Sequence, residues 1–170
     1  MPVSYRYAGF TLLELLITLA VLAIALAFAI PSFQGVIRSN QLTTEANMLG
    51  SALQLARSEA VKRGDNVSLS ASGASFASGF CVHSGATCTT TGTTPPPSRI
   101  QQYDALESNA TSGVTTITFN SAGERATSPT AALETVEIKP AGCASGEVDA
   151  MRRVSVRLGG HVNVSTKNCP

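Results

Sequence analysis

The chain has 170 residues, with 12 Lys and Arg against 11 Asp and Glu, and a formal net charge of +1. This balance gives no overall signal for binding nucleic acid or an anionic membrane surface, and the length leaves room for one modest domain. Only 5% of the residues are aromatic and none is Trp, so any core is built mainly from aliphatic side chains.

An apolar run begins at Phe10 and reaches Ile30. As a helix rising about 1.5 Å per residue, it spans roughly 30 Å, the thickness of the hydrocarbon core of a bilayer. Glu14 lies near the start of this run, and no basic residue follows in the segment to pair with it. A charge buried in an apolar medium is tolerated only when it is paired. The sequence therefore predicts a transmembrane helix over 10–30 whose carboxylate needs a partner from another chain.

Two other interpretations of the apolar run stay open. The first is an ordinary secretory signal peptide cleaved after Ala27-Phe28-Ala29, although Glu14 interrupts its apolar region and the run is longer than such peptides need. The second is a plain N-terminal anchor, which has the same hydropathy. In either membrane-bound case, Arg6 on the short flank favours a cytoplasmic N-terminus.

The helix is predicted to continue beyond the membrane segment. Pro31 and Gly35 should bend it, and Gly64 is the expected residue just past its end, giving one helix over 10–63. The 31–64 half is amphipathic, because its apolar residues recur at alternating spacings of four and three. That stripe consists of Leu42, Ala46, Leu49, Leu53, Ala56 and Ala60.

The rest of the chain, 65–170, has the alternating and β-branched patterns of strands, so we expect an α+β fold. A long polar, proline-rich stretch over 89–98 is predicted to be a surface loop. A weaker strand is expected at 99–103. The stronger strand candidates are 66–71, 75–83, 114–120, 135–139, 152–158 and 161–166.

The last two predicted strands form a hairpin whose register follows from its pattern. A three-residue loop over 158–160 places Val156 opposite Val162 and keeps one face apolar, whereas a two-residue Gly-Gly turn mixes the faces. In that register the exposed face carries Arg153, Arg157 and His161.

The N-terminal residues Gly9-Phe10-Thr-Leu-Leu-Glu14-Leu-Leu resemble the class III signal of type IV pilins and of type II secretion pseudopilins. Pro31 stands at mature position 22, where pilin helices commonly carry a proline. The resemblance implies that a prepilin peptidase cleaves between Gly9 and Phe10 and methylates the new Phe10 amine. It also implies that Glu14 pairs with the Phe10 amine of a neighbouring subunit.

The later part of the chain resembles the GspH/FimT family of minor pilins and pseudopilins. The matching segments are Leu55-Ala-Arg-Ser-Glu-Ala60, Ile117-Thr-Phe-Asn-Ser-Ala-Gly123 and the final hairpin. The resemblance implies the type IV pilin fold, a long bent N-terminal helix packed on antiparallel β-sheet. It implies a leader over 1–9, a single inner-membrane span over 10–30 and a periplasmic β-rich domain over 65–170. The expected partners are other major and minor pilins or pseudopilins, the prepilin peptidase and the inner membrane, and the expected destination is a pilus or pseudopilus.

Four cysteines lie beyond the membrane segment, where a translocated domain meets an oxidising compartment. Three connectivities are possible, and we favour Cys81 with Cys88 and Cys143 with Cys169. The competing interpretation is a metal site formed by Cys81, His83 and Cys88, whose spacing matches no standard zinc pattern.

No catalytic constellation or phosphate-binding loop is evident, so we expect no enzyme activity, no cofactor and no bound metal. Three functions remain: a minor pilin that helps initiate or cap a type IV pilus, a type II secretion tip pseudopilin of the GspH type, and a DNA receptor for transformation. DNA-binding FimT proteins carry Gly-Arg-x-Arg on the last hairpin, where this chain has Gly160-His-Val-Asn163. Arg152, Arg153 and Arg157 are the nearby candidates for DNA contact, and a solvated strand face is the better interpretation of them.

Overall fold

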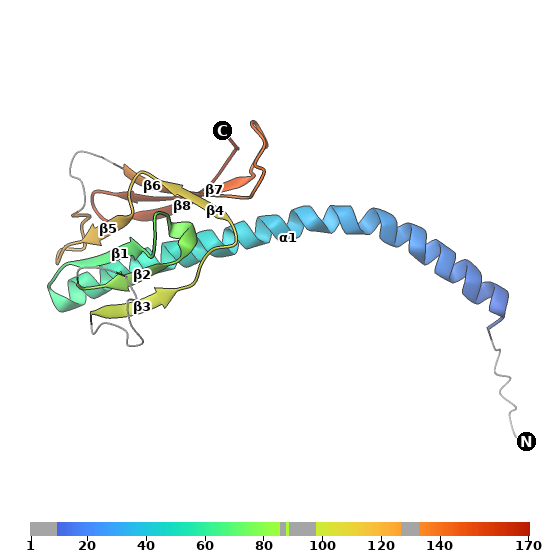
Figure 1. Cartoon of the computed structure of the whole chain (residues 1–170), viewed down its shortest axis with the longest axis horizontal. Helices are drawn as coiled ribbons and strands as arrows, with labels where there is room; N and C mark the ends of the chain where they lie inside the picture. The colour runs from blue at the N-terminus through green and yellow to red at the C-terminus, as the bar shows by residue number, and fades with distance from the viewer. Residues whose placement is uncertain (1–9, 86–87, 89–97, 127–132) are drawn as a thin grey trace, which may run out of the picture. The chain divides into compact units, whose positions relative to one another are not determined.

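The computed structural model describes residues 10–85, 88, 98–126 and 133–170, apart from the side chains of 29–32. Across these ranges the chain forms one long helix, one short 3-10 helix and eight strands in two antiparallel sheets. Two units can be distinguished, Met1–Arg38 and Ser39–Pro170. In the second unit the strands gather along the C-terminal half of the helix (Figure 1). The predicted α+β class and the packing of helix on antiparallel sheet are confirmed.

Helix α1 extends over Leu12–Arg63, two residues shorter at its start than predicted. The Thr11 hydroxyl oxygen accepts a hydrogen bond from the Glu14 backbone N–H at 3.1 Å, so Thr11 caps the first turn. At the other end Gly64 has φ +66°, and the Asp65 N–H donates to the Ala60 carbonyl at 3.3 Å. This is the Schellman pattern, and it confirms that the helix ends at Arg63 with Gly64 just past its end.

The predicted apolar stripe of α1 is confirmed as the helical side of the core. All six of its residues are at most 2% exposed, and they pack against Leu69, Phe80, Ile117 and Val154 from both sheets. Ala52 joins them at 0% exposure. The helix and both sheets therefore enclose a single hydrophobic core.

Glu45 is buried as well, although the sequence pattern places it off the stripe. Its side chain is covered by the segment before strand β4 (Asn109–Ser112), whose Glu107 and Ser108 backbone N–H groups donate to Oε1 at 3.0 and 3.3 Å. These hydrogen bonds satisfy two backbone donors that would otherwise be buried without partners. The carboxylate thus ties the 107–108 segment to the helix.

The first sheet has the strand order β3-β2-β1-β5. Every pair in it is antiparallel, with Leu69 of β1 opposite both Val82 of β2 and Ile117 of β5. Phe80 stacks on Tyr103 at the β2–β3 pair, with ring centroids 4.8 Å apart. The bounds are β1 Val67–Ala71, β2 Phe80–His83, β3 Arg99–Tyr103 and β5 Thr116–Phe119.

The single strand predicted over 75–83 is wrong. Its first part is the 3-10 helix η1, Phe76–Ser78, whose N-cap is Ser75, with the side-chain oxygen accepting from the Ala77 N–H. Gly79 then takes φ +92°, outside the strand region, and only β2 follows as strand. A capping serine and a permissive glycine thus outweigh the apolar pattern.

The second sheet has the order β4-β6-β7-β8, also antiparallel throughout. Its final hairpin has the predicted register, with Val156 opposite Val162 and Ser155 opposite Asn163. Strand β4 was not predicted, because only Ala110 of its four residues is buried. The bounds are β4 Asn109–Ser112, β6 Leu133–Lys139, β7 Met151–Arg157 and β8 Val162–Lys167.

Candidate functional site

The first unit presents an uncovered apolar surface. Every side chain from Phe10 to Phe28 is exposed, including Phe10 at 85%, Leu12 at 76% and Phe28 at 77%. Within the described residues no single helix meets the length and hydropathy required to cross a membrane, but Leu12–Phe28 and Phe33–Arg63 meet them when taken together as a bent pair. An apolar stretch of this size is typical of a surface that a bilayer or other subunits cover.

Glu14 lies on this surface as its one carboxylate, at the third position of α1. The Thr11-x-x-Glu14 spacing is that of a capping box, and an anion there interacts favourably with the helix dipole. The helix start was not predicted to carry a cap. Gly9 lies outside the described residues, as does the side chain of Pro31. The cleavage, methylation, assembly and bending roles assigned to Gly9, Phe10, Glu14, Pro31 and Gly35 stay predictions.

The four cysteines form two disulfides with the connectivity that the sequence analysis favours. Cys81 of β2 is bonded to Cys88, with Cα atoms 5.7 Å apart. Cys143 is bonded to Cys169, with Cα atoms 5.8 Å apart. The second bridge joins the loop before β7 to the C-terminus, where Cys169 and Glu147 are also joined by a backbone hydrogen bond.

His83 is held in place inside the second unit. It is 2% exposed, its Nδ1 is 2.7 Å from the Gly85 carbonyl oxygen and its Nε2 is 2.9 Å from the Ser70 hydroxyl oxygen. One of its ring nitrogens and the sulfurs of Cys81 and Cys88 lie within 4.8 Å of one another. The proposed metal ligands are thus brought together, but the two sulfurs are joined to each other and present no thiolate to a metal.

The three arginines considered for DNA contact do not share one surface. Arg152 faces α1 and donates to the Thr43 hydroxyl at 3.2 Å and to the Ser39 hydroxyl at 3.0 Å. Arg153 is paired with Glu137 across β6 and β7, its Nε 3.0 Å from the carboxylate. Arg157 alone among them is exposed. These three arginines therefore do not form a continuous positive surface that could bind a DNA phosphate backbone.

Arg57 joins two distant turns to the helix. Its Nε donates to the Gly123 carbonyl at 2.9 Å and its Nη2 to the Gly159 carbonyl at 3.3 Å. Gly123 follows β5 in the first sheet, and Gly159 lies in the β7–β8 turn of the second. Because its partners lie 66 and 102 residues away, sequence reasoning missed this role. The one hint of this role in the sequence is that Arg57 lies in segment 55–60, one of the segments whose resemblance to a known family is described above.

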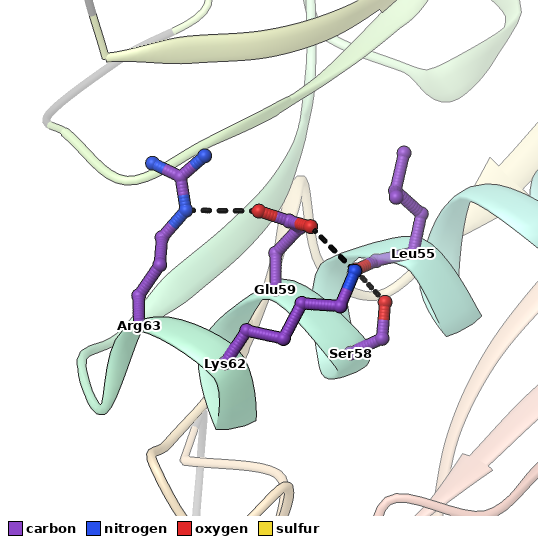
Figure 2. A network of polar contacts seen from close by, with 5 residues as sticks. All are labelled: Leu55, Ser58, Glu59, Lys62 and Arg63. Carbon is purple, nitrogen blue, oxygen red and sulfur yellow. Dashed lines mark hydrogen bonds and ion pairs between the residues drawn. The ribbon is translucent and has the colours of Figure 1, made fainter.

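A groove of about 580 Å³ opens beside this arginine, within the range of volumes that hold ligands. One wall is the last turns of α1 and the other is the start of β8. Lys62 lies on the helical wall, where it and Arg63 pair with Glu59 at 3.1 and 2.9 Å (Figure 2). The hydrogen bonds from Arg63 and Lys62 hold the pKa of the Glu59 carboxyl below its usual value. The lining includes Gln54, Arg57, Val61, Lys62, His161 and Val162.

Comparison with known proteins agrees with this architecture. Residues 5–30 match the prokaryotic N-terminal methylation motif, which implies a prepilin-type N-terminal anchor. Two crystal structures of the type IV minor pilin FimU of Pseudomonas aeruginosa, in space groups P21 and P65, are similar in fold. They have TM-scores of 0.57 and 0.55 and 23% and 24% sequence identity.

The structural similarity extends over 74% and 73% of this chain and over 89% and 92% of the two FimU chains. No curated protein matches the chain significantly. Residues 45–160, which include the Arg57 contacts and the helical wall of the groove, match the family described as type II transport protein GspH. The chain therefore belongs to the GspH family and has the type IV pilin fold.

Proposed function

We propose that the chain is a minor pilin of a type IV pilus, which helps initiate or cap the filament after cleavage by a prepilin peptidase. Cleavage between Gly9 and Phe10 leaves Phe10 as a methylated N-terminus. The mature chain is then anchored in the inner membrane by a single span, with the domain of 65–170 in the periplasm. Other major and minor pilins are its partners in the filament.

The observation that carries this proposal is the uncovered apolar helix with one carboxylate at its start. The methylation motif matches the same residues, 5–30. A carboxylate in this position is costly in lipid unless a cation pairs with it. The Phe10 amine of a neighbouring subunit supplies that cation, so lateral assembly offsets the cost of Glu14.

A tip pseudopilin of type II secretion is the second candidate, and the match to the GspH family favours it. Both candidates use the same anchor and the same domain, so deletion of the chain in its own organism separates them. Loss of surface pili supports the pilus, whereas loss of exported enzymes with pili intact supports the secretion system.

The assembly role is tested by Glu14→Ala, with Leu13→Ala as a neutral control in the same turn. We expect Glu14→Ala to stay in the membrane fraction, because its apolar character rises, and to be missing from sheared filaments. Leu13→Ala should be incorporated normally. Normal incorporation of Glu14→Ala would show that Glu14 does not direct assembly.

A further inference from the structure

The groove beside Arg57 combines an apolar floor with a cationic rim. Val61 is 53% exposed on its helical wall, and Val162 faces it from β8. Arg57, Lys62 and His161 stand around these two side chains, and no acidic residue lines the described part of the groove. Such a surface fits an apolar side chain that is flanked by carboxylates.

A surface of the opposite character lies before β7. Val148 is 71% exposed, one of the most exposed large apolar side chains in the second unit, and it stands between the exposed Glu147 and Asp149. The Cys143–Cys169 disulfide and the backbone hydrogen bonds of Cys169 with Gly146 and Glu147 hold this turn to the C-terminus. Asp149 has φ +56°, unusual for a residue other than glycine, and its N–H donates to the Asn168 side chain at 3.1 Å.

The groove and this acidic turn lie at opposite ends of the same sheet. The groove adjoins the β7–β8 turn and Val61 of α1, whereas Arg152, next to the acidic turn, bonds to Thr43 of α1 and to the Asp149 carbonyl. Thr43 and Val61 are 18 residues apart, about 27 Å along the helix. A shift of one copy along its helix, without rotation, therefore brings an acidic turn towards a groove.

We propose that the groove binds the Glu147–Asp149 turn of a second copy of this chain, with Val148 against Val61 and Val162. Glu147 and Asp149 then face Arg57 and Lys62 of the groove. Because the groove and the acidic turn are different surfaces, each of the two copies keeps one of them free for a further neighbour. The inference rests on the proposed function, since it supplies a longitudinal contact for a subunit that the apolar helix already places among its neighbours.

Cysteine cross-linking of the full-length mature chain in detergent tests the contact. Two variants that each add one cysteine to the two native disulfides, Val148→Cys and Val61→Cys, are mixed and oxidised, and we expect a disulfide-linked dimer. Val148→Cys mixed with Asn163→Cys is the matched control, because Asn163 lies on β8 but points to the opposite sheet face. A dimer yield equal in the two mixtures, or no dimer in either, would overturn the proposal.

Charge reversal separates a specific contact from chance collision. Adding Lys62→Glu to the Val61→Cys partner should lower the dimer yield by up to roughly fivefold, and adding Glu147→Lys to the Val148→Cys partner should restore it. Lys62→Gln is a second variant, which removes the positive charge without placing a carboxylate beside Glu59. A loss that Glu147→Lys does not restore would contradict the pairing.

Incorporation into filaments, measured on the same variants, keeps this inference apart from the proposed function. If Glu14→Ala is excluded from filaments but the Val61–Val148 cross-link never forms, the inference is wrong and the proposed function stands. If the cross-link forms but Glu14→Ala assembles normally, the assembly role of Glu14 is wrong. The Val61→Cys variant can also be cross-linked in filaments isolated from cells. If its cysteine then cross-links only to another pilin, that pilin occupies the groove, and the proposal of a second copy is wrong.

Discussion

Arg125 and Glu134 form an ion pair in the interior of the second unit. Arg125 Nη1 lies 2.9 Å from Glu134 Oε1, and the two side chains are 0% and 9% exposed. The backbone N–H of Arg125 also donates to Leu158, so this pair lies where the turn after β5 meets the second sheet. Removing one member of such a buried pair costs far more than the pair itself contributes to stability.

Glu134→Gln should therefore lower the free energy of unfolding by about 3–5 kcal/mol. Glu137→Gln on the same strand is the control, because its partner Arg153 is 35% exposed and a surface pair contributes only about 0–1 kcal/mol. Urea denaturation of the two variants measures the difference. Equal losses would show that burial of the Arg125–Glu134 pair has no special effect.

The contacts of Glu59 with Lys62 and Arg63 at the end of the helix (Figure 2) predict that the stability of the fold depends weakly on pH. Its pKa is lowered in the folded chain by Arg63 and Lys62, so the carboxylate stabilises the fold above the unfolded pKa of about 4.3. That contribution disappears as the pH falls through the lower folded pKa. The stability difference between the native chain and Glu59→Gln should shrink on acidification, and thermal unfolding at several pH values measures it. A difference that grows towards acid pH would reverse the assigned sign.

At the scale of elements, periodicity predicted most of the fold. The helix stripe and the register of the final hairpin are confirmed, because each depends on which side chains face the core. The bounds of β3 are confirmed as well, although its side chains do not alternate between core and solvent. Strand β4 was missed because its residues, Asn-Ala-Thr-Ser, have no such alternation and pair with β6 through the backbone. Local patterns also carry no information about long-range polar contacts, which is why the burial of Glu45 and the carbonyl contacts of Arg57 were not foreseen.

The β7–β8 turn depends on one of its two glycines. Gly160 has φ +73°, and a Cβ there would collide with the Gly123 carbonyl oxygen, whereas a Cβ at Gly159 meets nothing within 4 Å. Gly160→Ala should therefore destabilise the fold by more than about 1 kcal/mol, and Gly159→Ala should change stability by less than about 0.5 kcal/mol. Thermal unfolding compares them, and equal melting temperatures would contradict this role of Gly160.

The Cys143–Cys169 bridge closes a 26-residue separation and holds the acidic turn to the C-terminus. Replacing both cysteines with serine should lower the free energy of unfolding by about 3 kcal/mol, mainly because the unfolded chain regains loop freedom. Replacing both Cys81 and Cys88 with serine should lower the free energy of unfolding by less, because these residues are only 7 apart and their bridge closes a shorter loop in the unfolded chain. Denaturation under oxidising conditions measures both. An unchanged free energy of unfolding for Cys143→Ser/Cys169→Ser would show that the bridge contributes nothing to stability.

For the whole molecule, two units with different surfaces combine in one chain. The second unit buries most of its described apolar side chains in a single core, whereas the first unit leaves its described apolar side chains exposed. A folded domain joined to an uncovered apolar helix leaves a large apolar surface exposed. The proposed function assigns this surface first to the membrane and then to the filament. Membership of the GspH family and the methylation motif agree with this division.

The most direct test is the intact mass and N-terminal sequence of the protein extracted from membranes of producing cells. We expect the chain to begin at N-methyl-Phe10, as cleavage by a prepilin peptidase after Gly9 requires. A chain that begins at Ile30 would show cleavage as an ordinary secretory signal peptide, and one that begins at Met1 would show a plain anchor. Either result would contradict assembly through Phe10 and Glu14.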